Sequence, residues 1–335
     1  MKILIATKDY LPHLGGVPTM ARALKAGFES SGVEVKIVTQ TCDKHYEDSN
    51  TVFRNLSFKE NIQLYQWADI VLLNNMSVKA AFWAMLTNKP YVLSMSGWFS
   101  DGPNALFRFI FQFISSQASA NISACKAVQR ENYVDSTIIP NPYNDRIFTN
   151  LLIKREYSYL FAGRITECKG VIELINVWEN LTKKNIFLNL TIIGDGDLYP
   201  LLKKIIFDRK LEKYIQLKPS ISQEDLVFVL NQTDFFLIPS SWNEPIGIVC
   251  LEAIACGAIP IGSNGGGLGE SIGPCGLTFS RLNWNELEII IEKTVSMGEE
   301  EKERLRLFSR DHLKQFKIKL ISERYLQCMK SILGL

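Results

Sequence analysis

The stretch Ser240-Ser-Trp-Asn-Glu-Pro-Ile-Gly-Ile-Val-Cys-Leu-Glu252 carries the clearest fold signal in this chain. An apolar run typical of a buried strand stands directly before it. A helix that begins near Gly247 would place Ile248, Leu251 and Ala255 on one face, which is the spacing of a stripe that packs on a core. The segment therefore predicts a strand, a loop and a helix, the repeating unit of a parallel sheet.

Two acids and a helix start give this unit its candidate chemistry. The loop places Glu244 beyond the carboxyl end of the strand, where ligands bind in such sheets. The first-turn N–H groups at Gly247, Ile248 and Val249 have no helical partner and, with the helix dipole, form a candidate anion site. Glu252 lies in the second turn within an apolar stretch, and such a carboxylate needs a partner, for which we expect paired ribose hydroxyls. The alternative is a capped core helix with two incidental acids.

The same alternation of short apolar runs and helical patterns extends through both halves of the chain. Strands that alternate with helices predict a parallel sheet covered on both faces. One expected helix is 18–31, with Pro18 in its first turn and Gly32 just past its end. The expected strands are 2–7, 33–39, 69–73, 91–95, 120–123 and 137–139 in the first half, and 159–162, 187–193, 215–217, 235–238 and 258–261 in the second.

The length of 335 residues favours two domains, and the alternation breaks near Pro140-Asn141-Pro142, where a polar stretch follows. We expect an N-terminal Rossmann-like domain over 1–150, a C-terminal Rossmann-like domain over 151–315, and a helix over 316–335 that could pack back on the N-terminal domain. The expected fold class is α/β, with two Rossmann-like parallel-sheet domains that face each other across a cleft. Ligands bind beyond the carboxyl ends of such strands, which places the expected site in that cleft.

The composition argues against several classes of function. A formal net charge of +2 is too small to indicate a nucleic-acid partner. Seven cysteines without a Cys-x-x-Cys pair and only three histidines give a zinc site few ligands, and we expect reduced thiols in a cytoplasmic protein. The apolar start stops at Lys8-Asp9, too short for the core of a signal peptide. No stretch reaches the roughly 18 uncharged apolar residues of a membrane-spanning helix.

The pattern Glu-Pro-x-Gly-x-x-x-x-Glu-Ala, which contains Glu244 and Glu252, closely resembles the signature of glycosyltransferase family 4. Members are retaining enzymes with the two-domain architecture called GT-B. The resemblance implies an acceptor domain followed by a donor domain. It also implies transfer from a nucleoside-diphosphate sugar to a hydroxyl of a saccharide or lipid-linked acceptor, without a cofactor. Further matches are Gly15-Gly16, Asn141, Phe161-Ala-Gly-Arg164, Lys169-Gly170, Gly194-Asp-Gly196, Gly257, Pro260 and Gly266-Gly267-Leu-Gly-Glu270.

The resemblance also implies roles for single residues. Arg164 and Lys169 would bind the donor's diphosphate, and two cations there would stabilise the charge that the leaving nucleoside diphosphate gains in the transition state. Glu244 would lie beside the donor sugar and its anomeric carbon, while Glu252 would hold the ribose. Gly16 would let the backbone of the first βα loop approach the phosphates. The alternatives are a surface pair of cations and an ordinary turn glycine.

One position departs from the family pattern. A histidine commonly follows the strand that matches 91–95, and Ser96 stands there in this chain. The family histidine is thought to contact the donor sugar, so we group Ser96 with the donor-binding residues and expect an altered donor preference. For Asn141 and Glu270 we expect structural roles, capping a turn and a helix.

The segment Gly194-Asp-Gly-Asp197 contains an Asp-x-Asp pair, which holds a divalent metal in another glycosyltransferase architecture. Here two glycines indicate a tight turn, and we predict that the enzyme needs no metal. A Gly-x-Gly-x-x-Gly pattern is missing after the first strand, which argues against a nicotinamide-dependent enzyme.

The run 104–114 carries four phenylalanines, Phe107, Phe109, Phe111 and Phe113, and the single cation Arg108. It could form an amphipathic face that docks peripherally at the inner face of the membrane, near a lipid-linked acceptor. The other interpretation is an ordinary helix packed on the first sheet.

The resemblance favours a retaining glycosyltransferase in the biosynthesis of a polysaccharide or glycolipid, such as lipopolysaccharide. Two alternatives stay open. One is a sugar-nucleotide epimerase of similar architecture. The other is a sugar-nucleotide-binding protein that has lost catalysis, which Ser96 suggests and which the intact Glu244, Arg164 and Lys169 argue against.

Overall fold

The computed structural model describes residues 1–13, 15–41, 50–99 and 104–335. It divides into two compact units, Met1–Pro142 together with Gln315–Leu335, and Tyr143–Lys314. The six cysteines of the described part are free, and Cys42 and His45 lie outside it. Within the described ranges, no helix combines the length and the apolar character that crossing a membrane requires.

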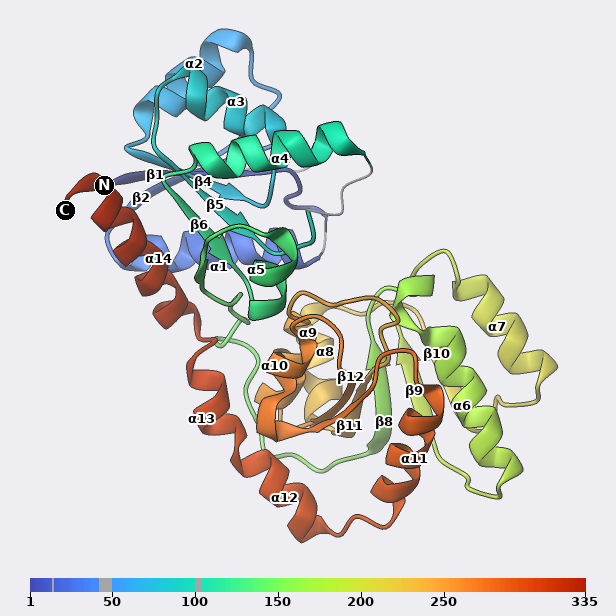
Figure 1. Cartoon of the computed structure of the whole chain (residues 1–335). Helices are drawn as coiled ribbons and strands as arrows, with labels where there is room; N and C mark the ends of the chain where they lie inside the picture. Colours follow the sequence, from blue (N-terminus) through green and yellow to red (C-terminus); the bar gives the residue numbers. More distant parts are fainter. Residues whose placement is uncertain (14, 42–49, 100–103) are drawn as a thin grey trace. The chain divides into compact units, whose positions relative to one another are not determined.

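The N-terminal unit is built on a seven-stranded parallel sheet with the order β3-β2-β1-β4-β5-β6-β7 (Figure 1). The strands and helices expected from the sequence are present, and β3 is an additional short edge strand. The strands are β1 Lys2–Thr7, β2 Glu34–Thr39, β3 Val52–Arg54, β4 Ile70–Asn74, β5 Tyr91–Met95, β6 Ala120–Ser123 and β7 Thr137–Ile138. The helices are α1 Gly16–Ser30, α2 Phe58–Trp67, α3 Val78–Leu86, α4 Ala105–Gln117, α5 Lys126–Asn132 and α14 Ile318–Leu333.

The alternation of side chains along β1 explains why both faces of this sheet are covered. Ile3 and Ile5 point to one face and pack with α1 and α14. Leu4 and Ala6 point to the other face and pack with α2, α3 and α4 (Figure 1). A strand that is apolar on both sides needs a helical layer on each side, which the sequence predicted.

The C-terminal unit contains a six-stranded parallel sheet with the order β10-β9-β8-β11-β12-β13. Its strands are β8 Tyr157–Ala162, β9 Leu190–Ile193, β10 Ile215–Lys218, β11 Thr233–Ile238, β12 Ile259–Ser263 and β13 Leu277–Phe279. Its helices are α6 Val171–Lys183, α7 Tyr199–Asp208, α8 Gln223–Asn231, α9 Ile248–Ala255, α10 Leu268–Ile272, α11 Trp284–Val295, α12 Glu299–Leu307 and α13 Ser309–Lys314, with the short 3₁₀ helices η1 Glu167–Lys169 and η2 Gly273–Cys275. The parallel-sheet architecture expected for both halves is confirmed.

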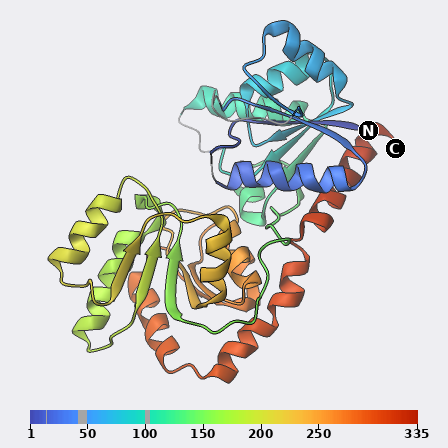
Figure 2. The ribbon, with the colours of Figure 1, turned by 180° about the vertical axis from the view of Figure 1, so that it is seen from behind.

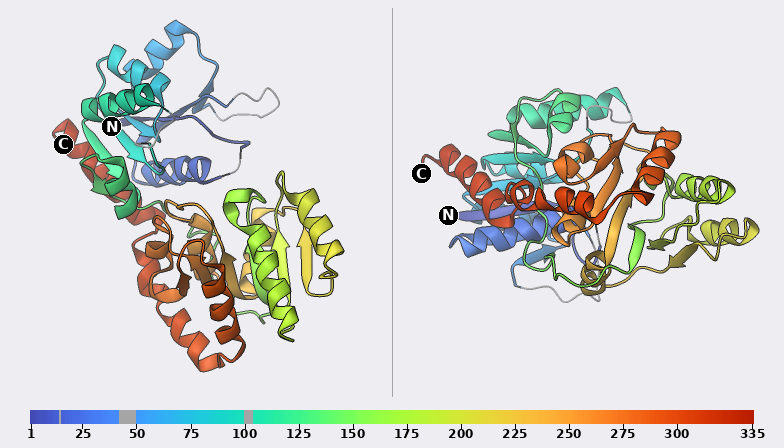
Figure 3. Two further views of the ribbon diagram at one scale, coloured as in Figure 1. Left: turned by 45° about the vertical axis from the view of Figure 1, so that its right-hand side comes forward. Right: turned by 90° about the horizontal axis from the view of Figure 1, so that it is seen from below.

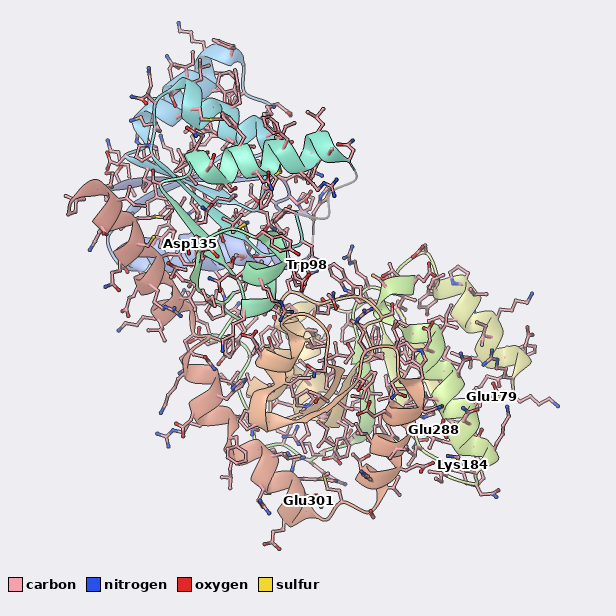
Figure 4. All side chains as sticks on the ribbon, in the orientation of Figure 1. Trp98, Asp135, Glu179, Lys184, Glu288 and Glu301 are labelled. Atoms are coloured by element: carbon pink, nitrogen blue, oxygen red, sulfur yellow. The ribbon has the colours of Figure 1, made fainter. Side chains whose placement is uncertain are left out.

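Helices cover both faces of this second sheet as well (Figures 2 and 3). Phe235 and Leu237 of β11 belong to the core that α6, α7 and α11 close. The alternate residues Phe236 and Ile238 are also buried and point to the opposite face, where α8 and α9 contact β11. Beyond the sheet, Lys184 at the end of α6 pairs with Glu288 of α11 at 2.6 Å, which ties these two helices together (Figure 4).

The division between the units falls after Pro142 rather than after residue 150. Asn231, the last residue of α8, explains the difference. Its amide donates to the Thr149 carbonyl at 3.0 Å and accepts from the Leu151 N–H at 2.6 Å. These bonds tie the segment that follows Pro142 to the C-terminal unit.

The C-terminal helix α14 packs along α1 and completes the N-terminal unit (Figure 1). The hydroxyls of Tyr325 and Ser94 share a buried hydrogen bond of 2.7 Å, and the Arg324 guanidinium donates to the Ile138 carbonyl at 2.6 Å. Helices α1 and α14 approach each other closely at Gly27 of α1, where an added Cβ atom would lie 1.8 Å from Oγ of Ser322 in α14.

Helix α4 corrects one part of the expectation for 104–114. Phe111 is 1% exposed and stacks on Phe99, with ring centroids 5.6 Å apart. Phe107 is half-buried, whereas Phe109 and Phe113 are exposed. The four phenylalanines therefore do not share one solvent-facing surface, because a helix advances about 100° per residue and alternate positions face different sides.

The contact between α1 and α14 gives a stability prediction. Gly27→Ala should lower the free energy of unfolding by roughly 1–3 kcal/mol, because the added methyl group overlaps Ser322. Ser322→Gly alone should cost about 1 kcal/mol as a glycine within a helix. Thermal unfolding of both single variants and the double variant measures the coupling. As the matched control, Gly298→Ala meets nothing within 4 Å. If the double variant loses as much stability as the two single variants together, the added methyl group does not overlap Ser322. The helices α1 and α14 would then move apart to make room for it.

Candidate active site

The loop that follows β11 leads directly into α9, as the sequence predicted. Gly247 precedes the helix with φ of 70°, and a Cβ atom there would lie 2.8 Å from Leu268 Cδ1. Gly247, Ile248 and Val249 are half-buried, so the first turn of α9 keeps access to solvent. From Cys250 onward the helix is buried, and the whole element is fixed in the core of the unit.

The backbone of Glu244 is held by the glycine-rich loop that follows β12. Gly267 N–H donates to the Glu244 carbonyl at 2.7 Å, and Glu244 forms an isolated parallel bridge with Gly266. Gly266 has φ of 65°, and a Cβ atom there would fall 2.2 Å from the Glu244 carbonyl oxygen. Only glycine permits this approach, so the loop fixes where Glu244 sits at the carboxyl edge of the sheet.

The side chain of Glu244 is buried, with 6% of the residue exposed. Lys169 Nζ and Ser240 Oγ both donate to its Oε1 atom, the serine at 2.7 Å. Among the described residues both contacts go to this one oxygen, so Oε2 keeps its capacity to accept a hydrogen bond from a ligand. The two contacts therefore orient the Glu244 carboxylate and leave one of its oxygens able to accept hydrogen bonds from a ligand.

Lys169 reaches Glu244 because η1 is packed on the loop after β11. Gly170 has φ of 66°, and a Cβ atom there would lie 1.9 Å from the Pro239 carbonyl oxygen. Ser241 N–H donates to the Cys168 carbonyl at 3.0 Å. The Lys169 ammonium also lies 6.0 Å from the centroid of the Trp242 ring. A cation is therefore fixed beside the carboxylate before any ligand binds.

Arg164 lies at the same edge, two residues after β8, and differs from Lys169 in its environment. It is exposed, and no hydrogen bond or ion pair joins it to another residue in the described part of the chain. The structure therefore brings Lys169 to Glu244 but leaves Arg164 separate from that pair. Its five N–H donors stay available to an anionic ligand.

Glu252 is the second acid of the motif, and its environment is unusual. It is 8% exposed, and burial raises the pKa of its carboxyl to about 7. No hydrogen bond or ion pair to this carboxyl occurs within the described residues. Burying an unpaired carboxyl costs folding free energy. A ligand that donates hydrogen bonds to Glu252 would supply the partner that the free protein lacks.

The segment Gly194-Asp-Gly196 packs closely against the loop after β8. A Cβ atom at Gly194 would lie 1.9 Å from the Gly163 carbonyl oxygen, and Ile165 N–H donates to the Asp195 carbonyl at 2.8 Å. The Asp195 carboxylate accepts a hydrogen bond from Ser220 N–H at 3.1 Å. No group of three or more His, Cys, Asp or Glu side chains suited to a metal occurs in the described ranges. The metal independence of the enzyme stays a prediction.

In the N-terminal unit, Ser96 follows β5 and is held by two asparagines. Its N–H donates to Asn75 Oδ1 at 2.7 Å, and its hydroxyl donates to Asn141 Oδ1 at 3.1 Å. Asn141 was expected to cap a turn and instead accepts from Ser96. Gly16 is the exposed first residue of α1, and its approach to a phosphate stays a prediction.

Three side chains near Glu244 were not singled out from the sequence. Ser240 and Trp242 stand within the motif itself, where only the acids and the helix start drew attention. Arg281 follows β13, and its guanidinium donates to the Ser241 carbonyl at 2.8 Å. A Cβ atom at Gly265 would lie 2.8 Å from Arg281 Cδ, so this arginine seats on the glycine-rich loop. Arg281 lies far from Glu244 along the chain, so no motif spacing in the sequence connects these two residues.

Comparison with known proteins identifies the family. Residues 144–310, about half of the chain, match the family model of Glycosyl transferases group 1. An uncharacterised glycosyltransferase of Methanocaldococcus jannaschii is 26% identical over 92% of this chain and 94% of its own length. A GDP-mannose:cellobiosyl-diphosphopolyprenol alpha-mannosyltransferase of Xanthomonas oryzae is 29% identical over 78% of each chain. The structure of Anabaena HepE in complex with UDP matches with a TM-score of 0.81 at 16% identity, over 99% of this chain and 100% of that one.

The chain belongs to the group 1 glycosyltransferases, and it is a glycosyltransferase with the GT-B fold. The resemblance noted in the sequence is thereby confirmed. A sugar-nucleotide epimerase is not favoured, because relatives that align over most of the chain are named glycosyltransferases. The roles of the single site residues stay predictions.

The pKa of Glu252 gives a prediction with a definite sign. The folded value of about 7 lies above the usual 4.5, so the folded protein retains a proton that the unfolded chain releases as the pH rises between these values. The carboxyl therefore costs stability as the pH rises, and the full cost is reached above pH 7. Glu252→Gln should raise the free energy of unfolding at pH 8 by roughly 3 kcal/mol at most, and by much less near pH 5.

Thermal unfolding of the donor-free protein at both pH values measures this effect. Glu212→Gln, which changes an exposed acid of the same unit, is the matched control and should leave the difference between the two pH values unchanged. A Glu252→Gln variant that is less stable at pH 8 would show that the carboxylate has a stabilising partner in the free protein.

Proposed function

We propose that this enzyme moves a sugar from a nucleoside-diphosphate sugar to a hydroxyl of a saccharide or lipid-linked acceptor, with retention at the anomeric carbon. The observation that carries the proposal is the cluster of the half-buried Lys169 with the buried Glu244 and Ser240 at the carboxyl edge of the C-terminal sheet. In it a fixed cation and a half-satisfied carboxylate lie side by side, which suits a ligand with an anionic part and a hydroxylated part.

The chain's own residues divide the donor between them in this proposal. Lys169 and Arg164 bind the diphosphate and stabilise the charge that develops on it as the glycosidic bond breaks. The N–H groups at the start of α9 add partial positive charge for the same oxygens. Glu252 accepts the ribose hydroxyls, and Glu244 Oε2 accepts a hydroxyl of the donor sugar.

The surroundings of Glu244 support a retaining route in which this carboxylate is not the nucleophile and the acceptor attacks from the face that the diphosphate leaves. A carboxylate whose Oε1 is already bonded to an ammonium and a hydroxyl is better placed to orient the sugar than to attack the anomeric carbon. The donor's own phosphate then accepts the proton of the acceptor hydroxyl. With Arg164 and Lys169 supplying positive charge, the reaction needs neither a metal nor a cofactor.

Properties of similar proteins support this donor and this setting. Anabaena HepE has been crystallised with UDP and with UDP-glucose. The Xanthomonas relative is named for GDP-mannose and a diphosphopolyprenol-linked acceptor, and an Erwinia amylovora relative is named for amylovoran biosynthesis. We place this enzyme in the biosynthesis of a polysaccharide or glycolipid at the cytoplasmic side of the membrane.

Replacing each cation tests the proposal. A thermal-shift screen of nucleotide sugars identifies the donor, because a ligand that binds only the folded state raises its stability. With that donor, Lys169→Ala and Arg164→Ala should each lower kcat for release of the nucleoside diphosphate by roughly 10²–10³-fold. Lys169→Ala should also lower the unfolding temperature, because it leaves a buried carboxylate without its cation. Arg164→Ala should not, because Arg164 is exposed and unpaired in the described structure.

The exposed Lys203→Ala on α7 is the matched control and should keep normal turnover. The anomeric configuration of the product, read by NMR, decides between retention and inversion. Normal turnover in both Lys169→Ala and Arg164→Ala would place the diphosphate elsewhere, and an inverted product would refute the retaining mechanism.

The serine at position 96 gives a prediction on donor preference. A serine is smaller than the family histidine, so we expect space or a water beside the donor sugar and weaker discrimination against a donor that lacks one hydroxyl. Ser96→His should shift kcat/KM toward the hydroxylated member of a pair of donors that differ by that hydroxyl. Ser96→Ala, which only removes the bond to Asn141, is the control for a structural effect. An unchanged ratio in Ser96→His would show that position 96 does not contact the sugar.

A further inference from the structure

Helix α3 presents apolar side chains to solvent. Its inner face buries the alanines and the tryptophan of the helix. Its outer face carries Val78, Phe82 and Leu86, which are 49%, 49% and 50% exposed and recur every four residues. A surface helix normally shows charged or polar residues on this side, so the outer face of α3 is the reverse of the usual pattern.

Helix α4 repeats the pattern. Its inner face buries Phe111 and Ile114, while Leu106, Phe109 and Phe113 are 66%, 66% and 48% exposed. These three residues follow the spacing of one helical face. The apolar residues of the run 104–114 therefore lie on two sides of α4. One side packs on the sheet and the other is exposed to solvent.

The two outer faces belong to one surface. Helices α3 and α4 contact each other and cover the same face of the N-terminal sheet (Figure 1). At the start of α2, Phe58 is 62% exposed and packs edge-on against Trp83 with ring centroids 5.0 Å apart. Phe82 packs against the same tryptophan at 5.3 Å. Aromatic contacts thus continue the surface from α3 to α2.

The charges on the two helices α3 and α4 have one sign, whereas the start of α2 beside them carries the exposed residues Lys59 and Glu60. The segment Val78–Leu86 contains one charged residue, Lys79, and Ala105–Gln117 contains one, Arg108. Both are exposed, and neither forms an ion pair within the described residues. An apolar face with one cation on each of its two helices, and no acid on either helix, is complementary to an anionic lipid surface.

We propose that the outer faces of α3 and α4 dock this enzyme on anionic lipid, with Phe82, Leu86, Leu106, Phe109 and Phe113 in the apolar boundary and Lys79 and Arg108 at the headgroups. A second copy of the chain fits this surface less well. In a symmetric dimer the same patch meets itself, so the interface would cover the cations of both copies, and neither helix offers an acid to pair them. The inference concerns where the enzyme acts and is independent of the donor chemistry proposed above.

Sedimentation with lipid vesicles tests the proposal. The enzyme should bind phosphatidylcholine vesicles that contain about a third phosphatidylglycerol more tightly than pure phosphatidylcholine, since each cation near an anionic surface strengthens binding roughly fivefold. Phe82→Ser combined with Phe109→Ser should weaken binding to both kinds of vesicle by about tenfold or more. The matched control is Phe207→Ser combined with Phe228→Ser, on helices of the other unit with 70% and 58% exposure, and it should bind normally.

A charge variant separates the contribution of the cations to vesicle binding from that of the apolar side chains. Lys79→Gln combined with Arg108→Gln leaves the apolar faces intact and should abolish the preference for anionic vesicles. Circular dichroism and donor turnover in solution should stay at the native level in every variant. Absence of vesicle binding by the native enzyme would overturn the proposal, as would native binding by both the phenylalanine and the charge variants. A native dimer that Phe82→Ser with Phe109→Ser converts to a monomer, with no change in lipid binding, would make this an interface between copies instead.

Discussion

The candidate site depends on how the backbone of Glu244 is held. Its carbonyl accepts the Gly267 N–H at 2.7 Å, and Gly266 approaches so closely that any Cβ atom would lie 2.2 Å from the same oxygen. This contact joins the loop after β11 to the loop after β12, two neighbouring strands of the sheet. It fixes where the Glu244 side chain begins, and the hydrogen bonds from Lys169 and Ser240 then hold the carboxylate.

Close backbone contacts of this kind connect the other loops at the same edge. Gly170 lies against the Pro239 carbonyl and Gly194 against the Gly163 carbonyl, each at a distance that excludes a side chain. The loops after β8, β9, β11 and β12 are thereby fixed to one another rather than mobile individually. A site whose dipoles and charges are already placed needs little reorganisation when charge develops in a reaction, which is an advantage for catalysis. Arg164 is the exception, because it is exposed and must be positioned by what it binds.

The N-terminal unit combines two differently covered faces on one sheet. On one face α14 seals α1, and the approach at Gly27 and the bond between Ser94 and Tyr325 make the C-terminal segment part of the N-terminal core. On the other face α2, α3 and α4 complete the core but leave apolar side chains outside. Leaving apolar surface in water has a cost in free energy, so an outer face of this composition is consistent with a partner that covers it. Anionic lipid meets that requirement and the charge of the surface together.

The sequence by itself determined the alternation of strands and helices, because a strand buried on both faces and a helix with an apolar stripe each leave a distinct period. The sequence analysis did not predict β3 or β13, because each of these strands has three residues, which are too few to show a hydrophobic period. The motif singled out both glutamates, but the contact of Lys169 with Glu244, 75 residues away, arose only in the folded chain. The same holds for Ser96 with Asn141 and for the two sides of α4. Spacing along a chain reports which residues share an element. The packing of elements decides which residues from distant segments meet, and which side of a helix with apolar residues on more than one side faces the core.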